Sequence, residues 1–237
     1  MAAGDDQRKR SPGARRWLRI GIGALLVLLA IPLVLVPLYA VVPPVSTPML
    51  ARWASFRPVD RQWRPLEDLG RDLPRAVIAS EDARFCSHWG IDWRELAAAL
   101  GAEGGPSRGA STIPMQTARN LFLWQGRTLV VIRKPLEMGL ALWMDLVWSK
   151  RRMLEIYLNI AEWGPNGVFG AEAGARRAFA RPAARLGPRQ SALMAAALPN
   201  PILRNPGKPT RALVAAASRI ERRVRAAPDA FGCIGGR

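Results

Sequence analysis

The chain has 237 residues, enough for one ordinary domain with a short appendage. With 49% hydrophobic and 22% charged residues it holds enough apolar material for a core, which excludes a wholly disordered chain. Its formal charge of +17 indicates an anionic partner, and on charge alone nucleic acid, anionic lipid and pyrophosphate-bearing substrates all remain open.

The first 42 residues predict a membrane anchor. Residues 1–19 form a basic tail, and residues 20–42 are almost wholly apolar, which covers the ~20 residues that cross a bilayer as a helix. The positive-inside bias keeps the tail in the cytoplasm and exports the rest of the chain. A cleaved signal peptide is the alternative, but its apolar core would be shorter, about 7–15 residues. Export argues against nucleic acid as the partner.

The exported part is predicted to be mainly α. Prolines make residues 43–60 a linker or stalk, and a helical domain follows over residues 61–230. Apolar residues at three-to-four spacing predict its helices, whereas alternating strand patterns are scarce. These helices are expected at residues 91–100, 132–148, 151–161, 188–198 and 212–227. Residues 231–237 are expected to form a frayed tail.

The chain has two cysteines, Cys86 and Cys233. They could pair in an oxidising compartment, but two cysteines are no disulfide framework, and we expect two unlinked thiols. The sequence holds no C-x-x-C or histidine-rich metal signature.

A carboxylate pair and the single histidine of the chain lie together in residues 79–90, ASEDARFCSHWG. A helix over residues 77–85 would place Glu81 and Phe85 on one face, because they are four apart. Apolar neighbours would raise the pKa of Glu81 toward neutrality, as a general base or acid requires. For an arbitrary sequence, a solvated Glu81–Asp82 pair and a structural His88 would be the ordinary interpretation.

Residues 109–122, GASTIPMQTARNLF, form a second cluster. Ser111 and Thr112 follow a glycine-containing loop and precede a predicted helix, so their hydroxyls and the free amides there suit an anionic oxygen. Gln116 and Asn120 lie four apart on that helix, with Thr112 one turn back. Such a polar stripe is costly unless it faces a site or water.

Two further clusters follow. Arg133, Lys134 and Glu137 are close in sequence, and a simple helix-surface ion pair between Arg133 and Glu137 is the ordinary interpretation. Residues 150–159, KRRMLEIYLN, carry apolar residues toward a core, and Glu155 and Asn159 there could be buried structural groups.

In this order the four clusters resemble the motifs of the family 51 glycosyltransferases, the peptidoglycan glycosyltransferases. The family patterns are E-D-x-x-F-x-x-H-x-G, G-G-S-T-x-x-Q-Q-x-x-K-N, R-K-x-x-E and K-x-x-I-L-E-x-Y-L-N, and residues 189–201 are similar to its closing motif. The second motif departs at Ala110, Met115 and Arg119, where the family has glycine, glutamine and lysine. Pro114 also lies inside it, which a helix accepts only in its first turn.

The resemblance implies a lysozyme-like glycosyltransferase domain on a single N-terminal transmembrane helix. It implies the monofunctional biosynthetic type, which polymerises lipid II into glycan strands for the cell wall. This type lies in the bacterial inner membrane, with its catalytic domain in the periplasm. Glu81 would be the base that deprotonates the 4-hydroxyl of the incoming N-acetylglucosamine. That hydroxyl would attack the anomeric carbon of the growing strand with inversion, as in inverting glycosidases, and undecaprenyl pyrophosphate would leave.

A pyrophosphate leaves without a proton donor, so the site needs cations, and the arginine fork suits phosphate. Glu137 matches the second essential carboxylate, which would organise these cations or a divalent metal, Mg or Mn. The resemblance and the residue pattern together assign substrate binding to Asp82, Phe85, His88, Ser111, Thr112, Gln116, Arg119, Asn120, Arg127, Arg133 and Lys134.

Two alternatives remain. A lytic transglycosylase or muramidase would share the fold but would cut glycan, with one acid glutamate and no need of the second and third clusters. A non-catalytic scaffold would keep the fold but lose Glu81 or Glu137, and both are present. The expected partners are lipid II, the growing strand and the membrane, with cell-division proteins or other cell-wall synthases left open and no nucleic acid.

Overall fold

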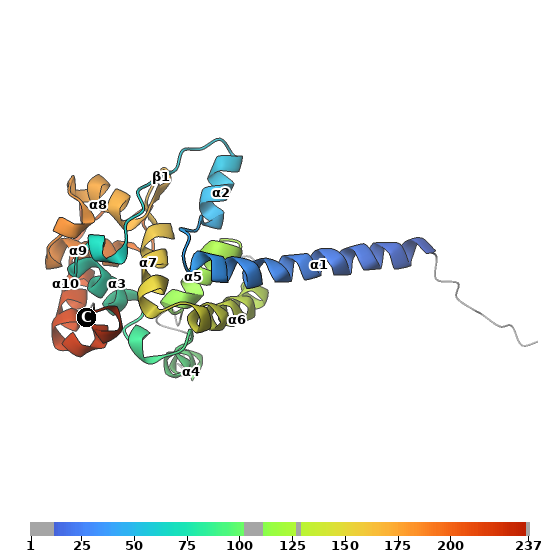
Figure 1. Cartoon of the computed structure of the whole chain (residues 1–237). Helices are drawn as coiled ribbons and strands as arrows, with labels where there is room; N and C mark the ends of the chain where they lie inside the picture. The colour runs from blue at the N-terminus through green and yellow to red at the C-terminus, as the bar shows by residue number, and fades with distance from the viewer. Residues whose placement is uncertain (1–11, 102–110, 127–128, 236–237) are drawn as a thin grey trace, which may run out of the picture.

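Helix α1 (Pro12–Tyr39) extends away from the rest of the protein as a single rod (Figure 1). The structure is a computed structural model that describes residues 12–101, 111–126 and 129–235. Within α1, residues Arg16–Tyr39 are long and apolar enough to cross a membrane, and an 18-residue window among them has a mean hydropathy of 2.7. The helix begins at Pro12 and not near Ile20, so the second half of the predicted basic tail is helical.

The described part of the chain is mainly helical, as predicted. Its longer helices are α2 (Thr47–Ala54), α3 (Asp72–Glu81), α4 (Trp93–Gly101), α5 (Ile113–Phe122), α6 (Val130–Val147), α7 (Lys150–Ile160), α8 (Ala171–Phe179), α9 (Pro188–Ala197) and α10 (Arg211–Ala226). Short 3-10 helices are η1 (Leu66–Leu69), η2 (Phe85–Ser87), η3 (Ala183–Arg185) and η4 (Pro228–Ile234). The predicted helices correspond to α4, α6, α7, α9 and α10, each within two residues at both ends.

Three elements were not predicted. Helix α2 lies inside the predicted linker, where the hydroxyl of Ser46 accepts a hydrogen bond from the amide of Met49 and Pro48 occupies the first turn. Helix α8 was also missed. A small sheet of order β1-β3-β2 joins β1 (Asp60–Arg61), β3 (Val168–Phe169) and β2 (Glu162–Gly164). These strands have two or three residues each, too few to show an alternating pattern.

The core forms where two groups of helices meet. Helices α3, α9 and α10 pack against one another, and α5 packs against both α6 and α7. Glu155 and Asn159 of α7 are structural, as the sequence suggested. The Asn159 side chain pairs with the backbone of Arg64 through bonds of 2.9 and 2.8 Å, and Glu155 accepts from the amide of Leu66 at 3.0 Å. Helix α7 thereby holds the chain that leads into α3.

The C-terminal end of α1 packs against the domain. The indole Nε1 of Trp143 donates to the carbonyl of Pro32 at 3.3 Å, and that of Trp148 donates to the carbonyl of Val36 at 2.7 Å. Both tryptophans belong to α6 or follow it directly. Helix α1 is therefore attached to the region of the helix that carries Arg133, Lys134 and Glu137.

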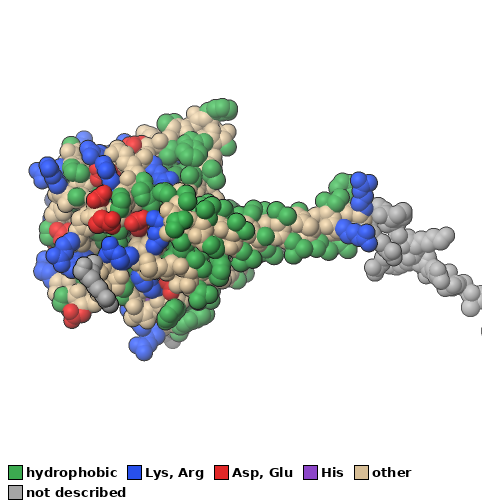
Figure 2. Space-filling view, viewed as in Figure 1, with side chains coloured by type: hydrophobic (Ala, Val, Ile, Leu, Met, Phe, Trp, Pro, Cys, Tyr) green, Lys and Arg blue, Asp and Glu red, His purple; other side chains and the backbone are tan. Residues whose placement is uncertain are grey.

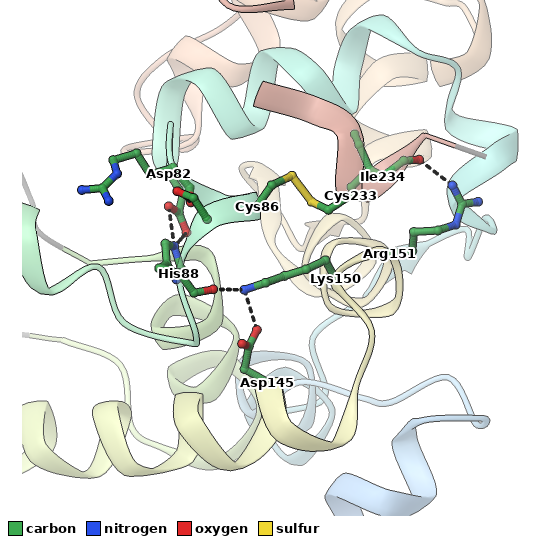
Figure 3. Close-up of a disulfide and its surroundings, with 10 residues drawn as sticks. Asp82, Cys86, His88, Asp145, Lys150, Arg151, Cys233 and Ile234 are labelled. Carbon is green, nitrogen blue, oxygen red and sulfur yellow. Dashed lines mark hydrogen bonds and ion pairs between the residues drawn. A yellow bond between two sulfur atoms is a disulfide. The ribbon is translucent and has the colours of Figure 1, made fainter. Parts of the chain in front are cut away.

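Cys86 and Cys233 form a disulfide, so the prediction of two unlinked thiols was wrong (Figure 3). Their Cα atoms lie 5.5 Å apart, because η4 folds back against η2. The predicted frayed tail was also wrong for the described residues up to 235. Phe231 is buried, and the Arg151 guanidinium donates to the carbonyl of Ile234.

Candidate active site

Glu81 is the last residue of α3, and its side chain is half-buried facing α5. Its Oε1 accepts from the hydroxyl of Ser80 at 3.2 Å, and its Oε2 accepts from Nε2 of Gln116 at 3.2 Å. Burial raises the pKa of Glu81 above its ordinary value of 4.5, and the charge of Asp82 adds to this. The two hydrogen bonds and Arg204 act in the opposite direction. A carboxylate in this setting suits a base that works near neutral pH.

The helix that carries Glu81 ends earlier than predicted. Asp82 leaves α3 with φ −159° and ψ 72°, so Phe85 does not lie on one helical face with Glu81. Instead Phe85 begins η2, and its ring is fully buried. The sharp exit frees the backbone after Glu81 to turn inward, which brings Asp82 and His88 together.

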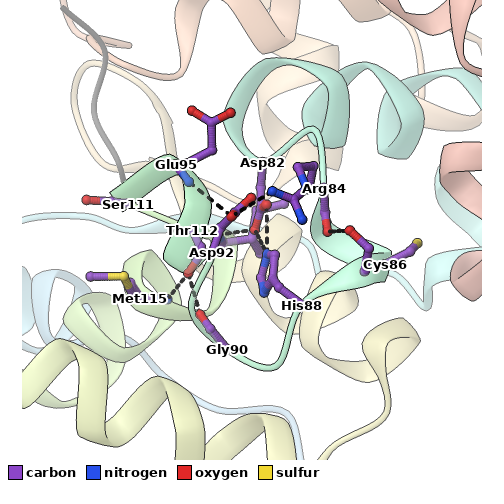
Figure 4. Close-up of polar contacts among 12 residues, drawn as sticks. Asp82, Arg84, Cys86, His88, Gly90, Asp92, Glu95, Ser111, Thr112 and Met115 are labelled. Carbon is purple, nitrogen blue, oxygen red and sulfur yellow. Dashed lines mark hydrogen bonds and ion pairs between the residues drawn. The ribbon is translucent and has the colours of Figure 1, made fainter. Parts of the chain in front are cut away.

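A buried brace connects this turn to the start of α5 (Figure 4). Both carboxylate oxygens of Asp82 lie near Nε2 of His88, at 2.9 and 3.1 Å, and one of them also accepts from the amide of Ile113 at 2.9 Å. Thr112 caps α5, and its hydroxyl donates to the carbonyl of Gly90 at 2.6 Å. The carboxylate of Asp82 therefore supplies an oxygen of the kind that the sequence predicted at this helix start.

Four of the residues predicted to contact substrate are part of this brace or pack against it: Asp82, Phe85, His88 and Thr112. All four are buried, and the contacts described for them are with protein groups. They hold Glu81 against α5, while direct contact with substrate stays a prediction for them.

Lys150, the first residue of α7, stabilises the brace through His88, a role that the sequence analysis did not assign. Its Nζ donates to the carbonyl of His88 at 2.6 Å and to Oδ1 of Asp145 at 2.7 Å, and it lies 5.0 Å from the centre of the Phe85 ring (Figure 3). The signal available was its place as the first residue of the fourth motif.

Two polar residues of α5, Gln116 and Asn120, contact different parts of the site. Gln116 is half-buried and donates to Glu81, as described. Asn120 is half-buried one turn later, where its Oδ1 accepts from Nε2 of Gln125 at 3.3 Å. Pro114 lies in the first turn of α5, the part of a helix that accepts proline. The stripe therefore reaches from Glu81 toward the loop after α5.

A buried carboxylate, Glu137, organises the cations of the third motif. Its side chain is fully buried, with Lys134 Nζ at 2.9 Å from Oε2 and Arg133 Nε at 3.0 Å from Oε1. Arg119 NH1 lies 3.9 Å from the same Oε1. Three cations thus surround one anion, which leaves an excess of positive charge at this point. The ion pair that could have been a simple surface contact lies in the interior.

The three cations differ in how far their side chains are exposed to solvent. The side chain of Arg133 is only 6% exposed, and it also donates to the carbonyls of Trp124 and Gly126. Arg119 and Lys134 are 27% and 35% exposed, so they are the members that face solvent. Arg127, the further predicted cation, lies outside the described residues.

The donor set around Glu137 does not suit a divalent metal. Both carboxylate oxygens already face cations within 4 Å, and a Mg or Mn ion there would meet their repulsion. No group of three or more His, Cys, Asp or Glu side chains able to hold a metal occurs among the residues that the structure describes. The cations themselves are the positive charge of this site.

Contacts run without a break from Glu81 to Glu137. Nε2 of Gln116 lies 3.2 Å from Glu81 and 3.4 Å from the carbonyl of Ser111, whose hydroxyl accepts from Lys134 at 2.6 Å. Lys134 then pairs with Glu137. A carboxylate suited to act as a base is therefore connected by contacts to a cluster of three cations.

A separate cavity of about 490 Å³ lies between η1, α3 and η4. Its lining includes Arg71, Arg75, Arg151 and Phe231 but none of the residues that contact Glu81 or Glu137. It is distinct from the candidate active site.

The chain matches the model of a protein family described as transglycosylase over residues 49–226. A biosynthetic peptidoglycan transglycosylase of Agrobacterium fabrum (strain C58) is 51% identical over 217 residues, which cover 90% of this chain and 95% of the relative. Proteins of the same name from Rhodopseudomonas palustris (strain HaA2) and Brucella suis biovar 1 are 55% and 51% identical. Each alignment covers 82% of this chain, and it covers 86% of the Rhodopseudomonas palustris protein and 87% of the Brucella suis protein.

Proposed function

Since the chain belongs to the transglycosylase family and is a peptidoglycan transglycosylase, we propose that it polymerises lipid II by inverting transfer. The observation that carries this proposal is the continuous contact from Glu81 through Gln116, Ser111 and Lys134 to Glu137. It supplies a base and an anion-binding group in one site, which are the two groups that the reaction needs.

In the proposed reaction Glu81 takes the proton from the 4-hydroxyl of the incoming N-acetylglucosamine. The hydroxyl oxygen then forms a bond to the anomeric carbon of the lipid-linked strand. The bond from that carbon to the pyrophosphate oxygen breaks, so the configuration inverts and undecaprenyl pyrophosphate leaves with the electron pair. An inverting displacement needs a base on one face of the anomeric carbon and the leaving group on the other, and Glu81 and the cations around Glu137 are proposed to serve these two faces.

Arg119 and Lys134 are proposed to bind the departing pyrophosphate. Both reach solvent, and both are oriented by the buried Glu137. Preorganised cations stabilise charge that develops in the transition state, because they need no reorganisation when the bond breaks. Arg133 is proposed to hold the loop around Trp124 and Gly126 beside this site. No metal ion is part of the proposal.

The enzyme is proposed to work at the periplasmic face of the inner membrane, with α1 as a single span. Arg16 and Arg19 lie at the N-terminal end of α1, which favours a cytoplasmic start. Apolar side chains gather on the domain around the point where α1 emerges (Figure 2). Helix α6 packs against α1, and its Val131 and Leu146 are exposed. Such a surface beside the anchor suits contact with lipid. Lipid II and the growing strand would reach the site from there.

The test is polymerisation of labelled lipid II by the detergent-solubilised full chain. We expect glycan polymer from the wild type and none from Glu81→Gln, which keeps the shape of the side chain and removes the base. Near-normal polymer from Glu81→Gln would overturn the assignment of the base. Hydrolytic fragments from preformed glycan would favour a lytic enzyme, and neither product would favour a scaffold.

A further inference from the structure

Tyr157 of α7 contacts the Gln116 side chain at the end of the amide that does not contact Glu81. Its side chain is 2% exposed, and its hydroxyl donates to Oε1 of Gln116 at 3.0 Å. The other end of the same amide, Nε2, donates to Oε2 of Glu81 at 3.2 Å. Three side chains from α7, α5 and α3 thus form one relay of hydrogen bonds.

We propose that Tyr157 is a positioning residue, whose hydroxyl holds the Gln116 amide in the one orientation in which its NH₂ group faces Glu81. This inference rests on the proposed function, because it concerns the base of that reaction. The hydrogen bond described for the Tyr157 hydroxyl is to Gln116, and we propose that Tyr157 acts through this amide.

The argument begins from the two ends of the amide. The side chain of glutamine has nearly the same shape after a half-turn, so its partners decide which end points where. After a half-turn Oε1 would face the carboxylate of Glu81, and two acceptors would oppose each other. The buried hydroxyl of Tyr157 would at the same time lose its acceptor, and a buried unsatisfied donor is costly. Both ends therefore favour the orientation that the structure has.

The hydroxyl can serve as the donor over the whole working range of pH. Burial raises the pKa of Tyr157 well above its ordinary value of 10.0, and the nearby charge of Glu81 raises it further. Arg119 acts against this shift but does not reverse it. The phenol keeps its proton, so its hydrogen bond to Gln116 persists.

The consequence falls on the ionisation of Glu81, because a donor to the charged form lowers the pKa of a carboxyl group. The other groups that face Glu81 are Ser80 and Asp82 at the end of α3, and Arg204 after α9. From α10, Arg223 donates to the carbonyl of Ala79. Helix α7 contributes the described hydrogen bond from Tyr157 to Gln116. Loss of its hydroxyl should change the Gln116 contribution and leave the others in place.

The test is Tyr157→Phe, which removes one hydroxyl and leaves the ring. The rate of lipid II polymerisation should fall on the acid side, with the midpoint of the acid limb about half a pH unit to one unit higher than in wild type. The rate should recover as the pH is raised. In a Gln116→Ala background, Tyr157→Phe should cause no further shift. Tyr39→Phe, at the only other tyrosine of the chain, should leave the profile unchanged.

A purely structural tyrosine would give a different result. An equal loss of rate at every pH, no change at all, or the same shift in the Gln116→Ala background would each overturn the inference. Failure of the wild type to make polymer would instead count against the proposed function. The inference is then tested without turnover, by infrared difference spectra between the chain and Glu81→Gln. The protonated Glu81 band should persist to higher pH in Tyr157→Phe, and an unchanged titration would overturn the inference.

Discussion

Cys86 and Cys233 are joined by a disulfide although 147 residues separate them along the chain. The bond fastens η4 to η2, which begins four residues after Glu81. Because it closes so long a loop, the chain-entropy account gives a stabilisation of about 5 kcal/mol, from the states that the unfolded chain loses. The last helical segment of the protein is thereby part of the support for the first motif.

Removal of this bond should lower the stability of the domain. We expect the double variant Cys86→Ser/Cys233→Ser to unfold roughly 5–15 °C below the wild type, which corresponds to about 2–5 kcal/mol in a chain of this size. Thermal unfolding in detergent measures this. A reductant should lower the wild-type midpoint and leave that of the double variant unchanged. Equal midpoints for both proteins without reductant would contradict the stabilising role.

Glu81→Gln should stabilise the fold while it removes activity. Burial raises the folded-state pKa of Glu81 above 4.5, so in the interval between the two pKa values the folded state holds more protons than the unfolded state. The stability of the wild type therefore falls as the pH rises through that interval. The cost of the buried charge grows as the pH rises through that interval, and it is absent below about pH 4.

The unfolding midpoint of Glu81→Gln should accordingly exceed that of the wild type near pH 7, because the variant does not carry the cost of the buried charge. The difference should shrink toward zero near pH 4. Midpoints measured at several pH values decide this, and a difference that grows at low pH would show that the sign is wrong.

Loss of the Glu137 charge should destabilise the domain strongly. Glu137→Gln leaves Arg119, Arg133 and Lys134 without their shared anion in the interior, and breaking a buried ion pair costs about 3–5 kcal/mol. The thermal midpoint measures the loss. Glu67→Gln is the matched control, because its side chain is 67% exposed and its ion pair to Arg151 is long, at 3.7 Å. Similar midpoints for the two variants would contradict the buried role of Glu137.

Arg119 and Arg133 should fail in different ways when changed to alanine. Arg119→Ala removes a solvent-facing cation, so kcat/KM for lipid II should fall about 10-fold to 100-fold with little change in the thermal midpoint. Arg119→Lys should keep much of the activity, because it retains the charge.

Arg133→Ala, by contrast, should lower the thermal midpoint, because it removes a buried cation that pairs with Glu137 and leaves the carbonyls of Trp124 and Gly126 without their donor. Measurement of both quantities on both variants separates binding from structure. Equal losses of stability in Arg119→Ala and Arg133→Ala would refute the distinction.

The sequence was sufficient for features that depend on neighbours along the chain. The membrane span follows from a run of apolar residues, and helices α6, α7, α9 and α10 follow from three-to-four spacing, because both patterns are local. The order of the motifs indicated the family, and Glu81, Gln116 and Glu137 do lie in one connected site.

Only the tertiary structure decided how distant groups meet. It paired Cys86 with Cys233, ordered the tail around Phe231, and turned Asp82, His88 and Thr112 inward as a brace. It also placed Tyr157 in contact with Gln116, from a helix 41 residues further on. No local pattern encodes such contacts, because they form only when the packing of α3, α5 and α7 brings side chains far apart in the sequence within bonding distance.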